Sequence, residues 1–286
     1  MTAVRALALL IAAGPLGGVP IGAQSAGGAP PAWTVSVDVG AGAPDGWVQV
    51  RENQLEGTRL RYRSDLGVRR AWTARVAVAH RLGARTSLDV AVEGWSLEGS
   101  AVPSADVVFN GATLAADSVL RTRTGFGDFL QVTVAVARRL LARPRAALTG
   151  RVGFTFVALN FVLQGTLAPG SALHETREDF VTQELPVPVA GLAYERALTS
   201  RLALEGAASG GWLPTVNSLR REGGEVTVTQ SHADLSLALR WRAARATHVR
   251  LGWRWTHFAQ REESTEDGNA IRLDRGAFTA GVRHAF

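Results

Sequence analysis

A serine and a histidine in the last quarter of the chain are the residue pair with the clearest potential for catalysis. Ser231 and His257 lie in two neighbouring segments in which apolar and polar residues alternate. If these segments pair as antiparallel strands around Arg245 or Ala244, Ser231 comes nearly opposite His257 on the apolar face. A serine hydroxyl within hydrogen-bond reach of an imidazole is the core of a nucleophilic hydrolase site. The sequence offers no obvious acid to orient the histidine, and chance proximity of two polar residues is the alternative interpretation.

Charged residues at alternating positions form a second group. If the apolar face of each segment points outward, these charges point into the interior. The predicted inward-facing set is Arg59, Arg61, Arg63, Arg75, Asp89, Glu93, Arg151, Glu205, Asp234, Arg240, Arg250, Arg254 and Arg283. Buried charges must be paired or hydrated, so two interpretations stay open. Either ion pairs fill a narrow, closed interior, or surplus arginine lines a water-filled passage that favours anions.

Metal and cofactor chemistry find little support in the sequence. The chain has no cysteine, which excludes disulfides, thiolate zinc sites, iron–sulfur clusters and cysteine nucleophiles. The acidic loop 262–269 could hold a divalent cation, but it lacks the ligand spacing of an EF-hand. One long loop also carries potential ligands in no known pattern, namely Ser171, His174, Glu175, Glu178 and Asp179. We therefore expect no metal site and no cofactor.

The charge balance excludes one further class of protein. All 31 basic residues are arginine and the formal net charge is +6, which at first sight suggests a nucleic-acid binder. The arginines are scattered along the chain and form no basic block, so we expect no nucleic-acid partner.

The first residues predict export. Arg5 precedes a short apolar stretch, 6–13, and small residues follow it. This order is typical of a secretory signal peptide, which we assign to residues 1–23, with cleavage near Ala23. The apolar stretch is shorter than the about 20 residues that a membrane-spanning helix needs. Residues 24–32, rich in Gly, Ala and Pro, are expected to form a flexible leader, and 33–286 form the folded domain.

Alternation with a period of two residues continues along the rest of the chain and predicts strands with two different faces. Leu235, Leu237, Leu239 and Trp241, for example, alternate with polar or small residues. The predicted strands are 33–41, 46–52, 57–65, 70–82, 85–98, 120–140, 145–164, 182–198, 201–213, 225–242, 246–262 and 271–286. That makes twelve. Ten is the competing count, because 46–52 could be a loop and bacterial single-chain barrels have even strand numbers.

The lengths of the connections predict a barrel in a membrane. Short connections, such as 82–84 and 243–246, alternate with long polar ones, such as 98–120, as in exported antiparallel barrels. In lipid, every backbone polar group must be satisfied internally, so a sheet can span only if its edges meet. The sequence therefore predicts an all-β, transmembrane antiparallel β-barrel with an apolar outer face. Aromatic residues should mark its two interfaces with water, among them Trp72, Trp95, Trp212 and Trp255 near the long loops.

The end of the chain resembles the C-terminal assembly signal of bacterial outer-membrane β-barrel proteins. That signal ends in an aromatic residue with apolar residues at alternating positions before it. Phe286, Val282 and Phe278 match it, whereas His284 departs from it. The resemblance implies a location in the outer membrane, insertion by the barrel assembly machinery, and contact with outer-membrane lipids and lipopolysaccharide.

Within this class, the sequence favours a porin-like barrel that passes or binds a small anionic solute, or a structural membrane barrel. On this interpretation the protein is not an enzyme and has no catalytic residues. The alternative is a lipid hydrolase of the outer membrane with Ser231 and His257 on the outer wall.

Overall fold

The computed structural model describes residues 31–286 apart from 53–54, 170–171, 180–185, 218–224 and 266. The predicted signal peptide and the leader as far as residue 30 lie outside the described residues. Within the described ranges, no helix is long and apolar enough to cross a membrane.

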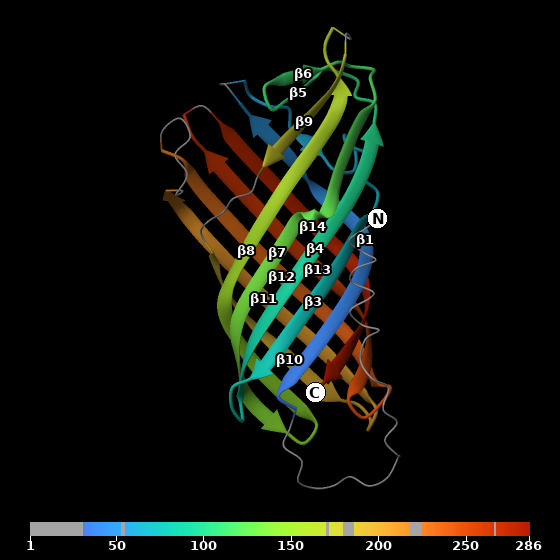
Figure 1. Ribbon diagram of the computed structural model, residues 1–286, viewed down its shortest axis with the longest axis vertical. Coiled ribbons are helices and arrows are strands. Elements are labelled where there is room, and N and C mark those ends of the chain that lie inside the picture. Colours follow the sequence, from blue (N-terminus) through green and yellow to red (C-terminus); the bar gives the residue numbers. More distant parts are fainter. Residues whose placement is uncertain (1–30, 53–54, 170–171, 180–185, 218–224, 266) are drawn as a thin grey trace. The chain divides into compact units, whose positions relative to one another are not determined.

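Ten long strands form a closed antiparallel ring (Figure 1). Each strand pairs with its neighbours in the chain, and the pairing of β1 with β14 closes the ring. The ring strands are β1 (Trp33–Arg51), β3 (Ala71–Arg81), β4 (Thr86–Ala101), β7 (Leu120–Arg143), β8 (Ala146–Thr166), β10 (Val187–Ala197), β11 (Leu202–Asn217), β12 (Thr227–Arg242), β13 (Thr247–Glu263) and β14 (Gly268–Ala285). Closure satisfies both edges of the sheet, as a barrel in lipid requires.

Four short strands lie at the long-loop end. Strand β2 (Leu60–Arg61) pairs with β1, and β9 (Leu173–Asp179) pairs with β8. Strands β5 (Val107–Phe109) and β6 (Ala112–Leu114) form a separate hairpin. The main sheet has twelve strands when β2 and β9 are included, whereas the ring itself has ten, the competing count of the sequence analysis.

The difference between the twelve predicted strands and the ten strands of the ring arises at the start of the barrel. The predicted strands 33–41 and 46–52 are one strand, β1, whose pairing with β14 runs without a break from Thr34 opposite Ala285 to Arg51 opposite Gly268. The glycines and Pro44 between them suggested a turn, but partner backbone on β14 keeps this stretch extended. The predicted strand 57–65 contributes only β2 to the sheet, because its apolar side chains pack into the barrel interior.

The outer wall is apolar between two aromatic belts. In β12, Leu235, Leu237, Leu239 and Trp241 all face outward and are about half exposed, and Phe278 of β14 is 78% exposed. An apolar surface of this extent suits lipid and would be a liability in water. Trp72 and Trp212 lie on this surface near the long loops as expected, but Trp95 does not: it points inward and is 1% exposed.

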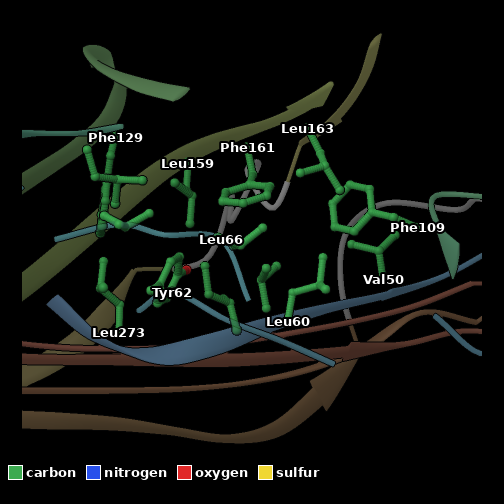
Figure 2. Packing of buried hydrophobic residues seen from close by; sticks show 14 of the residues in the cluster. Val50, Leu60, Tyr62, Leu66, Phe109, Phe129, Leu159, Phe161, Leu163 and Leu273 are labelled. Carbon is green, nitrogen blue, oxygen red and sulfur yellow. The ribbon is translucent and has the colours of Figure 1, made fainter. Parts of the chain in front are cut away.

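The interior at the long-loop end is filled by an apolar cluster, which we call the plug (Figure 2). Inward-facing wall residues such as Phe161 and Phe129 meet Leu60, Tyr62 and Leu66 from the β1–β3 connection and Phe109 from β5. The Phe109 and Phe161 rings lie 5.7 Å apart, and the Phe129 and Trp95 rings 4.4 Å apart. The plug therefore ties the loop segments to the barrel wall.

Candidate active site

Three adjacent strands bring a serine, a histidine and an aspartate together on the outer wall. In the register of β12, β13 and β14, His257 lies directly between Ala233 and Asp274, and Ser231 is one position further along the same face of β12. Residues two apart on a strand share a face. Ser231 and Leu235 therefore point outward together, as do Asp274 and Phe278.

The three side chains form a hydrogen-bonded chain. Ser231 Oγ and His257 Nε2 lie 3.4 Å apart, and His257 Nδ1 and Asp274 Oδ1 lie 2.7 Å apart. With the proton on Nδ1, His257 donates to Asp274 and leaves Nε2 free to accept from the serine. This is the arrangement of a Ser–His–Asp triad, in which the acid orients the base and the base activates the nucleophile. A serine–histidine contact at the long end of the hydrogen-bond range is usual before substrate binds.

The surroundings hold the triad in place. Arg272 Nε donates to the second carboxylate oxygen of Asp274 at 2.7 Å. The rings of His257 and Trp255 stack with centroids 6.0 Å apart. The His257 and Asp274 side chains are only 20% and 17% exposed, so both are held by their neighbours and remain reachable from the outer surface.

The triad lies where the apolar band ends. Ser231 is ten positions from Trp241, the aromatic residue of β12 at the short-turn end, and a membrane-spanning strand needs about 9–11 residues. The triad is therefore at the interface with water on the long-loop side. In a lipid, the ester bonds between acyl chains and headgroup lie at this depth.

Sequence reasoning identified two of these three residues and missed the third. The predicted pairing of the two strands around residue 245 agrees with the observed register. Asp274 was not predicted, because the sequence of the polar loop between β13 and β14 does not define the register of these two strands. Its signal was present: a carboxylate an even number of residues before Phe278 stands on the outward face.

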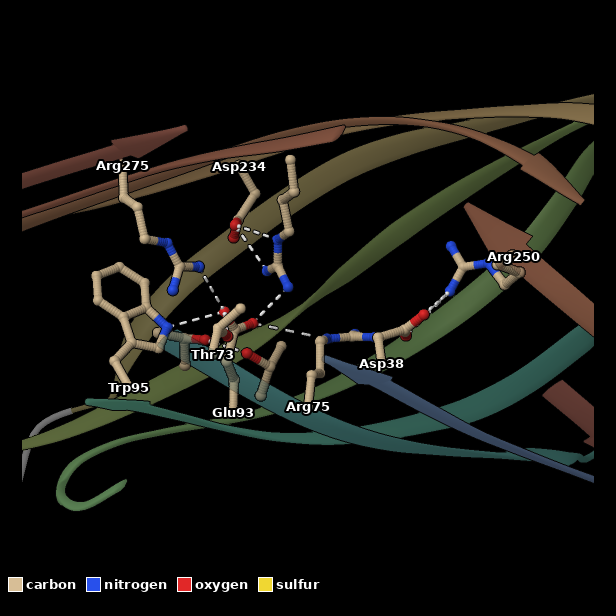
Figure 3. Close-up of polar contacts among 11 residues, drawn as sticks. Asp38, Thr73, Arg75, Glu93, Trp95, Asp234, Arg250 and Arg275 are labelled. Atoms are coloured by element: carbon tan, nitrogen blue, oxygen red, sulfur yellow. Dashed lines mark hydrogen bonds and ion pairs between the residues drawn. The ribbon is translucent and has the colours of Figure 1, made fainter. Parts of the chain in front are cut away.

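A second cluster of polar residues lies inside the barrel and is centred on Glu93 (Figure 3). This carboxylate is 4% exposed and receives Arg275 NH2 at 3.1 Å, Arg75 Nε at 3.8 Å and a closer contact from Arg254. Trp95 Nε1 and the Thr73 hydroxyl also donate to it, at 2.8 and 3.0 Å. Arg254 in turn contacts Asp234 at 2.7 Å.

A third cluster surrounds Glu205 nearer the short-turn end. Arg240, Arg250 and Arg283 reach its carboxylate at 2.8–3.0 Å. Arg250 also contacts Asp38 at 2.9 Å (Figure 3), and Arg240 pairs with Glu195. All of these inward residues except Arg240 line a cavity of about 470 Å³.

The structure places the other predicted inward residues as follows. Arg151 pairs with Asp89 at 3.4 Å inside the barrel. Arg59, Arg61 and Arg63 require a correction: they are exposed on the connection between β1 and β3, outside the spanning strands. They leave the wall because 57–65 is not a spanning strand. The inward residues Asp38, Glu195 and Arg275 were not predicted.

No metal centre is found in the described part of the chain, where no group of three or more His, Cys, Asp or Glu is arranged to hold an ion.

Neither a family model nor a curated protein matches the sequence. Among solved structures, the outer-membrane protease OmpT from Escherichia coli matches with a TM-score of 0.51 at 13% identity, covering 88% of this chain and 97% of OmpT. The transport unit of the autotransporter AIDA-I from Escherichia coli matches with a TM-score of 0.38 at 9% identity, covering 89% and 90%. The toluene transporter TodX from Pseudomonas putida matches with a TM-score of 0.33 at 8% identity, covering 90% and 91%. The chain has the fold of the bacterial outer-membrane β-barrels, and the resemblance of its last residues is confirmed at the level of this class.

Proposed function

We propose that this protein is a serine hydrolase of the bacterial outer membrane that cleaves acyl esters of lipids at Ser231, His257 and Asp274. The observation that carries the proposal is the hydrogen-bonded chain of these three side chains on the lipid-facing wall. This is the enzyme alternative of the sequence analysis, with Asp274 as the acid that it lacked.

The arrangement supports hydrolysis in two steps. Ser231 Oγ attacks the ester carbonyl carbon while His257 Nε2 takes the hydroxyl proton, and the alcohol leaves with that proton as the acyl–serine ester forms. Water then attacks the acyl–serine, His257 again moves the proton, and the fatty acid is released. Asp274 stabilises the imidazolium that forms in each step.

A lipid substrate follows from the position of the triad. The acyl chain of a bound lipid can lie along the apolar wall below the triad, next to Leu235 and Leu237. Its ester group then reaches Ser231 without leaving the interface. A water-soluble ester would gain nothing from this wall.

Hydroxyl groups for the developing oxyanion lie on the same face. Thr229 is two residues before Ser231, and its hydroxyl lies 2.9 Å from that of Thr215. Thr215 belongs to an irregularity in β11, between Leu213 and Val216. Bulges of this kind occur often beside active sites, and we assign Thr229 to the stabilisation of the intermediate.

Two features of the interior weigh against solute passage. The plug fills the barrel at the long-loop end, and the inward arginines that would favour an anion are engaged by acids. Ion pairs of this kind correspond to the closed-interior interpretation of the sequence analysis. Insertion by the barrel assembly machinery and contact with lipopolysaccharide stay predictions.

The test is release of fatty acid from lipids in mixed detergent micelles by the purified mature protein. We expect hydrolysis by the wild type, none above background by Ser231→Ala, and a loss of roughly 10⁴-fold in kcat for Asp274→Asn, which removes the charge that orients His257. Thr229→Val should lower kcat roughly 10²-fold. A fluorophosphonate probe should label Ser231 alone.

Ser236→Ala is the matched control, since Ser236 lies on the same strand but faces the interior cavity. It should behave as the wild type. Wild-type protein that is folded, unlabelled by the probe and no more active than Ser231→Ala on any lipid would contradict the proposal.

A further inference from the structure

Exposed arginines lie beside the triad on the outer wall. The cross-strand row of Ser231 continues through Ala259 to Arg272 and then to Trp47 of β1. Arg261 is in the next row toward the long loops, opposite Thr229. The side chains of Arg272 and Arg261 are 53% and 71% exposed, although each also contacts an acid.

A third guanidinium is held at the end of this row. The Arg59 guanidinium lies over the Trp47 ring, 4.3 Å from its centre, and Arg59 Nε donates to Gln49 Oε1 at 3.3 Å. Stacking on the indole fixes the charge at the level of Arg272. Arg59, Arg261 and Arg272 together form what we call the arginine rim.

The arginine rim has free capacity to bind an anion. Arg272 uses Nε for Asp274, and within the described residues its two terminal nitrogens have no hydrogen-bond partner. Arg261 contacts Glu263 through Nε and one terminal nitrogen, which leaves the other terminal nitrogen. Guanidinium groups match the oxygens of a phosphate in geometry and charge.

Distance allows a single lipid to span both groups. Adjacent strands are about 4.8 Å apart, so the backbones at Ser231 and Arg272 are separated by roughly 10 Å. Because an arginine side chain is long, its guanidinium can reach toward Ser231. The remaining distance between the guanidinium and the serine hydroxyl is then short enough for a few bonds of a lipid headgroup to span. In acyl lipids that carry phosphate, the ester and the phosphate are separated by only a few bonds.

We infer that the substrates of this site are acyl lipids with a phosphate next to the ester, and that the arginine rim binds that phosphate. This inference rests on the proposed function and names its substrate class. Glycerophospholipids and the phosphorylated lipid of lipopolysaccharide share this chemistry. Neutral glycerides carry the ester without the charge.

The first measurement does not depend on hydrolysis. Ser231→Ala protein is placed in micelles containing brominated phosphatidylglycerol or a brominated diacylglycerol of the same chain length, and quenching of tryptophan fluorescence reports lipid at the wall. We expect stronger quenching by the phosphatidylglycerol, and a loss of this preference in Arg59→Gln and Arg261→Gln or at high salt. Arg201→Gln, at a short turn, is the charge-matched control and should keep the preference.

The second measurement uses the active protein. We expect Arg261→Gln to raise KM for phosphatidylglycerol roughly tenfold, the equivalent of one charged hydrogen bond, with kcat unchanged. KM for diacylglycerol should not change. A lipopolysaccharide arm shows which phosphate source is cleaved, and cleavage of either one with the same dependence on Arg261 supports the inference.

The two proposals fail in different ways. Equal quenching and equal kcat/KM for phosphatidylglycerol and diacylglycerol, unaffected by Arg59→Gln and Arg261→Gln, would overturn the inference and leave the hydrolase intact. Preferential quenching without hydrolysis of any lipid would overturn the hydrolase and keep the arginine rim as a lipid-binding surface.

Discussion

At the scale of single residues, polar groups in this barrel are placed where other groups satisfy them. A charged residue on the lipid-facing wall is costly at the centre of the bilayer and nearly free at its edges. Ser231, His257 and Asp274 lie at the edge, and they bind one another and Arg272. Inside the barrel, the buried carboxylates of Glu93 and Glu205 are each paired with three arginines.

Among the inward residues described, Glu93 is expected to contribute most to the stability of the barrel. Three arginines share its carboxylate, and the Arg275 side chain is fully buried over the Trp95 ring. We expect Glu93→Gln to lower the free energy of unfolding by about 3–5 kcal/mol, because it leaves buried cations without a counter-charge. Urea unfolding in lipid vesicles, followed by tryptophan fluorescence, measures this change.

Asp89→Asn is the control for that measurement. Asp89 pairs with Arg151, whose side chain is 42% exposed, so its loss should cost less than about 1 kcal/mol. Equal unfolding midpoints for Glu93→Gln and the wild type would show that the cluster around Glu93 adds nothing to stability.

At the scale of elements, the seam between the first and last strands decides whether the barrel closes. Strand β1 stays paired with β14 over its full length although it contains Gly40, Gly42, Pro44 and Gly46. Gly46 has a φ of +115°, which favours glycine. At Gly42, a Cβ atom would lie 1.9 Å from the carbonyl oxygen of Gly276. The glycines thus permit close backbone contact at the seam and do not mark a turn.

We expect Gly42→Val to prevent closure of the ring, because its side chain would meet backbone atoms of β14 that cannot move without breaking the ladder. The folded fraction, measured as the heat-modifiable band in gel electrophoresis without boiling, should fall severalfold. Gly83→Ala in the β3–β4 turn, where a Cβ meets nothing within 4 Å, should fold as the wild type. A normal folded fraction for Gly42→Val would mean that the seam tolerates separation.

At the scale of the whole barrel, the outer wall and the interior differ in the residues that they present. The wall presents an apolar band to lipid and carries the triad at its upper edge. The interior is closed by the plug toward the long loops and braced by ion pairs below it.

We therefore expect no steady ion conductance from the folded protein in planar bilayers at moderate voltage, because the plug excludes water from the path. Arg250→Ala should be equally silent, since the arginine lies below the plug. A stable anion-selective conductance that is lost in Arg250→Ala would restore the interpretation of the barrel as a passage for anions.

The sequence by itself determined the fold class, because the alternation of side chains is a local property that every spanning strand repeats. It also determined the pairing of Ser231 with His257, since one short turn sets the register of two adjacent strands. Only the tertiary structure decided the number of strands in the ring, because backbone contacts across the seam and side chains packed into the plug come from residues far apart in the chain. It also decided the third member of the triad. Asp274 can be placed opposite His257 only when the register of the last hairpin is known. That register depends on a polar loop whose sequence does not define the position of the turn.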